Sequence, residues 1–276
     1  MARAQSNHAR LWRMGFVLSV GILALWVSGF GLKEAVTSQN GARQIVKKMI
    51  VAHGGLERWK SAPTVSFEDH LRAPGVPSPL VSRVTVEQGR RRAYLDYPDN
   101  GMRLGWDGER AWSENWAHPY PARFMALLNY YFANLPWLTM DPGVRLGEPG
   151  TARLWDDSTN YVTIRMTFDE GVGDTPDDYY VLYIHPTTHQ LSAVEYVVTY
   201  AAILPEGVKA SPPNVVVYEE HAKVDGLIVP IRYTIYSKKD RSVQVAWEIL
   251  DWSFSKPFDS ARLMMPEGAV VDESIL

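Results

Sequence analysis

The segment Tyr161-Val-Thr-Ile-Arg-Met-Thr-Phe168 alternates apolar and polar side chains along its whole length. Successive side chains of a β-strand point to opposite faces, so Val162, Ile164, Met166 and Phe168 should share one apolar face. Further strands are expected after it, over residues 179–184, 191–200, 215–221, 227–236 and 243–252. The pattern predicts an antiparallel meander whose apolar face must be covered by another element.

A second group of strands is expected before this segment, over residues 64–71, 80–87, 91–97, 102–106 and 110–116. Asn100-Gly101 gives a strong hairpin signal between two of them. We expect Asp107-Gly108 and Asp225-Gly226 to form two-residue turns with a positive φ at each glycine. The chain therefore predicts two sets of strands with a different kind of segment between them.

That intervening segment, residues 121–138, is long, apolar nearly all round and free of internal glycine, which predicts a helix. A helix of this kind is either buried core or a lid over an apolar groove, and the sequence leaves both open. The predicted ligand-binding residues come from this helix and the opposing strand: Phe124, Leu128, Tyr131, Phe132, Trp137, Val162, Ile164, Met166 and Phe168.

The N-terminus has the composition of a targeting segment. Arg3, Arg10 and Arg13 lie in a basic head over residues 1–13, and residues 14–32 contain no charged side chain. This order is typical of a signal peptide or a transmembrane anchor, with the basic end in the cytoplasm and the rest outside it. Residues 33–41 are expected to be a tether, followed by a helix over 42–53 that opens one domain spanning 42–276.

Composition excludes several classes of function. A net charge of −3 and a pI near 6.2 give no support to nucleic-acid binding. The chain has no cysteine, so it has no disulfide, no cysteine nucleophile and no lipidated cysteine. No catalytic motif, metal-ligand spacing or cofactor-binding glycine pattern is present, and we expect no metal, no cofactor and no enzymatic activity.

Several motifs together resemble those of the outer-membrane lipoprotein carrier (LolA/LolB-like) family. They are His53-Gly-Gly-Leu-Glu-Arg-Trp59, Thr64-Val-Ser-Phe67, Gly105-Trp-Asp-Gly-Glu-Arg-Ala-Trp112, Tyr183-Ile-His-Pro-Thr-Thr-His-Gln-Leu191 and Val224-Asp-Gly-Leu-Ile-Val-Pro230. The resemblance implies an α+β fold, in which a strongly curved antiparallel sheet forms an incomplete β-barrel and helices cover its concave face. His185 stands where that family usually has an aspartate, which changes the chemistry of the turn.

The resemblance also implies a function, that of an extracytoplasmic carrier or chaperone for lipid, lipoprotein acyl chains or another apolar ligand. The expected partners are a lipid or acylated protein, a membrane protein, and the inner membrane through the N-terminal segment; nucleic acid is not expected. Two alternatives stay open. One is a membrane-anchored sensor or protein-interaction module with the same fold, and the other is a hydrolase whose catalytic residues meet only in space.

Overall fold

A computed structural model describes residues 40–172, 175 and 177–274 of the chain. Residues 40–52 are helical, and the other helices are α2 (Leu56–Lys60), α3 (Ala122–Leu138), η1 (Ala201–Ile203) and η2 (Ser260–Leu263). The strands before α3 are β1 (Thr64–Arg72), β2 (Leu80–Glu87), β3 (Ala93–Tyr97), β4 (Met102–Trp106) and β5 (Ala111–Glu114). Those after it are β6 (Val144–Leu146), β7 (Gly150–Ala152), β8 (Tyr161–Phe168), β9 (Tyr180–Ile184), β10 (Leu191–Tyr196), β11 (Asn214–Val224), β12 (Leu227–Ser237), β13 (Val243–Ser253) and β14 (Val270–Val271).

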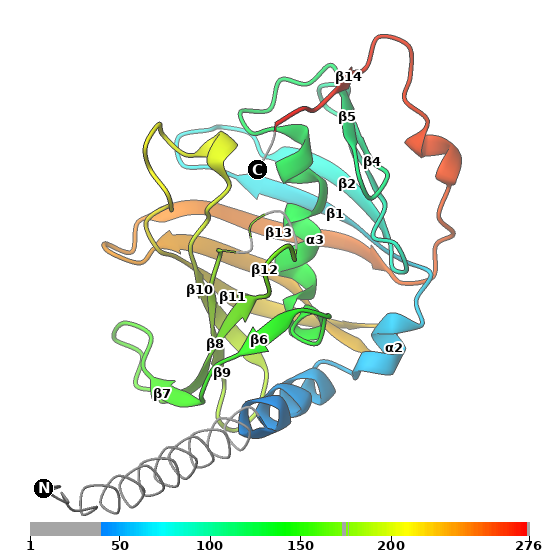
Figure 1. Cartoon of the computed structure of the whole chain (residues 1–276). Coiled ribbons are helices and arrows are strands. Elements are labelled where there is room, and N and C mark those ends of the chain that lie inside the picture. The colour runs from blue at the N-terminus through cyan, green and yellow to red at the C-terminus, as the bar shows by residue number, and fades with distance from the viewer. Residues whose placement is uncertain (1–39, 173–174, 176, 275–276) are drawn as a thin grey trace, which may run out of the picture.

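The strands form one curved antiparallel sheet that does not close on itself (Figure 1). Within the described residues the strand order is β14-β5-β4-β3-β2-β1-β13-β12-β11-β10-β9-β8-β6, with β7 paired to β8. The two predicted groups of strands are therefore joined through the β1–β13 pair. Helix α3 lies in the concave face, while residues 40–52 and α2 lie at one end of the sheet. The predicted curved sheet with a helix on its concave face is confirmed.

The alternation along β8 has the predicted consequence for packing. Ile164 and Met166 are fully buried in the main core, and Val162 and Phe168 pack against its edge. On the opposite face, the guanidinium of Arg165 lies 3.7 Å from the centre of the Tyr179 ring. The concave side of the sheet therefore carries the core, as a one-sided strand pattern requires.

The two predicted Asp-Gly turns have different outcomes. Asp225-Gly226 is a two-residue turn between Val224 and Leu227, with φ of 50° and 83°, as predicted. At Asp107-Gly108 the predicted positive φ of the glycine is present, at 104°, but the two-residue turn is wrong, because Trp106 pairs with Ala111 and the loop has four residues. The Asp107 carboxylate accepts hydrogen bonds from the backbone N–H groups of Glu109 and Arg110, at 2.8 and 2.7 Å, and these bonds stabilise the longer loop.

Three of the motifs that carry the family resemblance meet in space at His53. Its buried ring donates from Nδ1 to the carbonyl of Ile228 (2.9 Å) and accepts at Nε2 from the N–H of Leu191 (3.1 Å). The neighbouring Gly54 has a φ of 100° and lies against the backbone of Gly226 and Leu227. We call this contact between residues 53–54, 191 and 226–228 the His53 clasp. It fixes the N-terminal helix to β10 and β12.

The predicted basic head and the apolar segment over 14–32 lie outside the described residues. Across residues 40–172, 175 and 177–274, no helix is both long enough and apolar enough to span a bilayer.

The His53 clasp predicts that alanine is tolerated very differently at two adjacent glycines. Both Gly54 and Gly55 have a φ near 100°, so either substitution incurs backbone strain. A Cβ on Gly54 would lie 2.4 Å from the carbonyl oxygen of Gly226, whereas a Cβ on Gly55 would meet nothing within 4 Å. We expect Gly55→Ala to cost about 1–2 kcal/mol and Gly54→Ala to cost a further ~2 kcal/mol or more. Urea denaturation of both variants measures this difference, and equal losses would contradict the close contact.

Candidate ligand-binding site

The two ends of helix α3 lie in different surroundings. Trp137, near its C-terminus, is fully buried and stacks on Trp59 of α2, with ring centres 5.8 Å apart. The Trp59 Nε1–H donates to Asn134 Oδ1 at 2.8 Å, which fixes this end of the helix further. In contrast, Phe124 and Leu128, nearer the N-terminus, are only half-buried. The C-terminal half of α3 is therefore core, and its N-terminal half is partly free of packing partners.

Polar contacts hold α3 in place along its length. Asn129 donates to the carboxylate of Asp69 on β1, and the Tyr130 hydroxyl donates to Gln88 Oε1 at 2.6 Å. The carbonyl of Phe132 accepts from the hydroxyl of Tyr218, a residue of β11, at 2.7 Å. These contacts reach both halves of the sheet, so α3 is a fixed part of the interior and not a loosely attached lid.

One cavity lies between α3, the β2–β3 turn and strands β8 to β10. Its volume is about 750 Å³. Aromatic and aliphatic side chains dominate its interior: Phe124, Leu127, Leu128, Tyr131, Phe132, Phe168, Tyr180, Tyr196, Val198 and Tyr200. Arg90, Arg91 and Arg123 also border it, and Arg91 is paired with Asp141 at 2.5 Å. We call this the arginine-side cavity.

A second cavity lies between the N-terminal half of α3 and the sheet. Its volume is about 670 Å³. It is bordered by β1, β2, β12 and β13, through Leu71, Leu80, Ile235, Val245 and Trp247, and by the loops beyond these strands. We call this the loop-side cavity. Both volumes fall in the range of small-molecule sites in proteins.

The two cavities share a wall. Phe124, Leu128 and Phe132, which follow each other at four-residue spacing on α3, border both cavities. Tyr196 and Val198 on the β10 side border both as well, and the rings of Phe132 and Tyr196 are 4.9 Å apart. The space around α3 is therefore divided by a few side chains and not by backbone.

The structure brings some of the predicted site residues together and separates others. Phe124, Leu128, Tyr131, Phe132 and Phe168 border the arginine-side cavity. Trp137, Ile164 and Met166 are instead fully buried core, and Val162 packs at the edge of that core. The alternation of β8 gives the face of each residue, but does not show which residues on that face are buried in the core and which border a cavity. That the residues beside the cavity bind a ligand stays a prediction.

Sequence reasoning missed most of the wall opposite α3. Tyr180 and Tyr196 face each other across β9 and β10 and both border the arginine-side cavity. The hairpin turn at residues 185–190 could have suggested that pair. However, a register shift between Leu191 and Ala193 displaces the pairing of β9 with β10 by one residue. No sequence pattern predicts such a shift.

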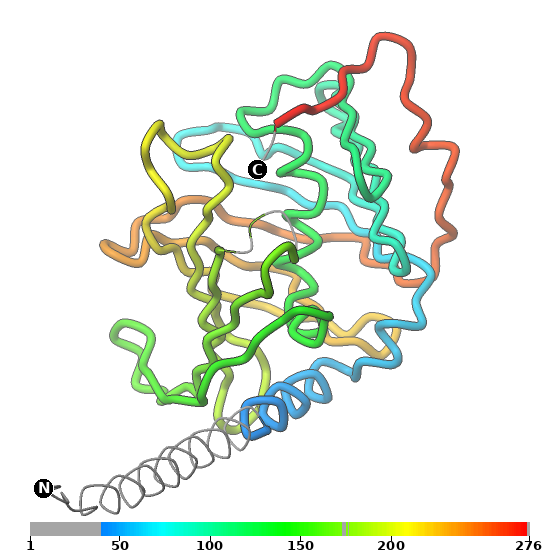
Figure 2. The backbone as a smooth tube through the Cα atoms, viewed as in Figure 1, coloured from blue at the N-terminus to red at the C-terminus, as the bar shows by residue number. Residues whose placement is uncertain are grey.

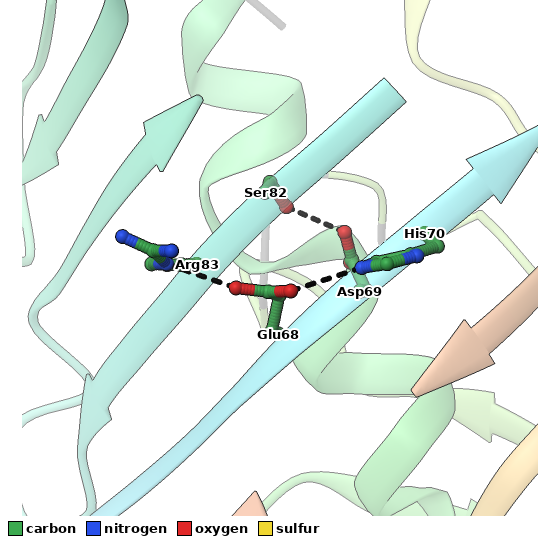
Figure 3. Close-up of polar contacts among 5 residues, drawn as sticks. All are labelled: Glu68, Asp69, His70, Ser82 and Arg83. Atoms are coloured by element: carbon green, nitrogen blue, oxygen red, sulfur yellow. Dashed lines mark hydrogen bonds and ion pairs between the residues drawn. The ribbon is translucent and has the colours of Figure 1, made fainter. Parts of the chain in front are cut away.

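Asp69 is a buried carboxyl in an otherwise apolar interior. It accepts from Ser82 Oγ at 2.6 Å and from Asn129, on the side of the sheet that faces α3 (Figure 3). Its neighbours Glu68 and His70 lie on the other face, where Glu68 bonds to His70 and Arg83. Burial raises the pKa of Asp69 to about 7, although both hydrogen bonds act in the opposite direction.

No protein-family model matches the sequence, and no curated protein does. Solved structures do. A DUF1329 family protein from Desulfovibrio piger aligns with 9% identity and a TM-score of 0.52, covering 80% of this chain and 96% of that one. A LolA superfamily protein from Nitrosomonas europaea aligns with 11% identity and a TM-score of 0.48, covering 81% and 97%. A protein domain from Vibrio parahaemolyticus, described as outer membrane lipoprotein-sorting, aligns with 6% identity and a TM-score of 0.49, covering 82% and 97%.

The chain therefore shares its overall fold with the DUF1329 family protein. Identities this low concern the fold alone and carry no ligand from one protein to another.

The buried Asp69 predicts a specific dependence of stability on pH. Its pKa is raised to about 7 in the folded state, so the folded chain retains a proton that the unfolded chain loses above its ordinary pKa of 3.8. The contribution of Asp69 to the free energy of unfolding is therefore full below that ordinary pKa and is lost as pH rises through the folded value. An asparagine at this position cannot titrate, so the Asp69→Asn variant should gain about 3 kcal/mol relative to wild type between pH 5 and pH 8.

The control for this measurement is Glu68→Gln on the opposite face of the same strand. Hydrogen bonds from His70 and Arg83 lower the pKa of Glu68, so its stabilising contribution is fully present above its ordinary pKa and is lost only as pH falls below that value. Between pH 5 and 8 the difference between Glu68→Gln and wild type should stay constant. Urea denaturation at both pH values tests each variant, and a pH-independent difference for Asp69→Asn would contradict the shifted pKa.

Proposed function

We propose that this chain is a binding protein for an apolar, lipid-like ligand, and that it acts as an extracytoplasmic carrier or chaperone. The observation that supports this most directly is the pair of cavities beside α3, separated by Phe124, Leu128 and Phe132. Their interior surfaces are mainly aromatic and aliphatic, which suits hydrocarbon. Resemblance to the lipoprotein carrier family, predicted from the motifs, agrees with this proposal.

Simple energetics favour an acyl ligand in such a space. Burying each methylene group contributes about 0.8 kcal/mol, so ten methylenes contribute roughly 8 kcal/mol before the cost of ordering the ligand. That affinity suffices for capture and still allows release. The proposed partners are accordingly a lipid or an acylated protein, and the membrane that supplies it.

We propose binding and not catalysis for this site. Burial raises the pKa of Asp69 to about 7, but this carboxyl is enclosed between Ser82 and Asn129 and borders neither cavity. His53 has its pKa lowered to about 4 by burial, and both of its ring nitrogens are occupied by backbone partners in the His53 clasp. Asp69, whose pKa near 7 would suit acid–base chemistry, and His53 thus both have structural partners and border neither cavity.

The site predicts that a carboxylate at Leu128 abolishes binding without unfolding the domain. Leu128 is half-buried and borders both cavities, so glutamate there would place a charge beside the ligand while water still reaches it. We expect the affinity for a fluorescent fatty-acyl probe to fall by roughly tenfold or more. The measurement is a fluorescence titration of the chain from residue 40 onward, which contains every strand of the described sheet.

Two matched variants control this experiment. Leu135→Glu, on the same helix, lies at a fully buried position and should unfold the domain by circular dichroism. Met264→Glu lies at a position that is 73% exposed and should change neither binding nor stability. If the folded wild-type domain binds no acyl probe and carries no lipid in native mass spectrometry, the proposed function is wrong.

A further inference from the structure

The loop-side cavity opens among several turns that lie on one side of the molecule. They are the β1–β2 turn over residues 73–79, the segment 115–121 before α3, and the loop 199–213 after β10, and each contributes residues to the cavity wall. The β12–β13 hairpin tip, residues 238–242, joins them through a hydrogen bond from the Lys238 N–H to the Pro213 carbonyl (3.1 Å). Figure 2 shows these turns on the side away from η2. We call this surface the loop-side rim.

The loop-side rim exposes large apolar side chains. Val76 is 56% exposed, Tyr120 is 44% exposed and Val208 is 43% exposed. Val76 and Tyr120 also border the cavity, and Val208 follows the cavity residues Ile203 and Leu204 along the same loop. Apolar side chains therefore occur both in the cavity lining and on the outer surface of the loop-side rim.

Charge is distributed unevenly around this rim. Residues 73–80, 115–121 and 199–205 contain no Asp, Glu, Lys or Arg. Around them, residues 72–80, 115–121, 199–213 and 238–242 hold five basic and two acidic residues, a net formal charge of +3 in a chain of net −3. Lys238 and Arg241 pair with Glu195 and Asp156. Arg72, Lys209 and Lys239 form no ion pair with any residue that the structure describes.

We propose that the loop-side rim docks on an anionic lipid bilayer. Tyr120 would lie at the level of the headgroups, where aromatic side chains are favoured, and Val76 and Val208 would bury apolar surface at the boundary between headgroups and acyl chains. Arg72, Lys209 and Lys239 would face the anionic headgroups, each contributing attraction over a short range. This rim matches a bilayer in two ways at once, with an apolar centre and a basic periphery.

Docking would give the cavity a second property. An apolar ligand that moves through water from a bilayer to a protein exposes its hydrocarbon to water on the way. The hydrophobic effect makes this exposure unfavourable. A cavity mouth held against the bilayer removes that step. This consequence rests on the proposed function, whereas docking itself involves only the rim and can be measured on the chain without added ligand.

The chain has no cysteine, which allows a direct test with single labels. Val76→Cys, Val208→Cys and Met264→Cys would each carry one environment-sensitive fluorophore in the full-length chain. On vesicles containing phosphatidylglycerol, labels at residues 76 and 208 should shift to the blue and be quenched by lipid-borne quenchers. The label at residue 264, which directly follows η2 and is 73% exposed, should keep the emission it has in water.

Charge provides the second arm of the test. Lys239→Ala, made in the labelled Val76→Cys chain, should weaken docking on the anionic bilayer about fivefold. The reason is that one basic residue near an anionic surface contributes about 1 kcal/mol to the free energy of binding. Vesicles of phosphatidylcholine alone should give little docking. Lys47→Ala, on the helix over residues 40–52, is the matched control and should change nothing.

Three results would overturn the proposal. The first is water-like emission at residues 76 and 208 on anionic vesicles, and the second is an equal response from the label at residue 264. The third is a blue shift without vesicles that disappears on dilution, which would assign the rim to contact between two copies of the chain. Failure of acyl-probe binding alone would overturn the proposed function and leave the docking result standing.

Discussion

The structure depends on one geometrical constraint: a single helix of 17 residues covers the concave face of a sheet that has fourteen strands in the described residues. One helix cannot fill that volume. Its C-terminal half packs tightly through Trp137 and Asn134, and its N-terminal half leaves space on two sides. The cavities are therefore the consequence of covering a wide curved sheet with too little helix, while polar contacts keep that helix from sliding into either of them.

The contact between Asp69 and Asn129 holds α3 in place, but the buried carboxyl lowers the stability of the fold. A buried carboxyl is unfavourable when charged, and its raised pKa records that cost. The hydrogen bond nevertheless fixes the rotation of α3, since Asn129 has to face β1. With that rotation set, Leu128 and Phe132 border the two cavities. A polar group that weakens the fold thus gives the apolar site its shape.

Much of the fold could be predicted from the sequence, because the determining signals are local. The alternation of β8, the apolar run of α3 and the Asp225-Gly226 turn each depend on a few adjacent residues. The candidate site was harder to predict from the sequence than the fold. Trp137 and Phe124 are equally apolar, and which of them is core depends on Trp59, distant in sequence. Likewise, the four-residue loop at Asp107 depends on side-chain hydrogen bonds that compete with the two-residue turn.

The resemblance motifs have a physical meaning that their sequences do not reveal. Residues 53–54, 191 and 226–228 are far apart in the chain, and each looks like an ordinary turn or helix end. Together they form the His53 clasp, in which a glycine is required because another backbone occupies the place of its side chain. The residues of the His53 clasp specify how the N-terminal helix joins the sheet, and none of them borders either cavity.

The shared wall has a consequence for capacity. Phe124, Leu128 and Phe132 are side chains, and each can change rotamer within a fixed helix. A rotation that enlarges the arginine-side cavity takes volume from the loop-side cavity, and the reverse is equally true. The volumes of the two cavities are thus coupled: any volume that one gains by such a rotation is lost by the other.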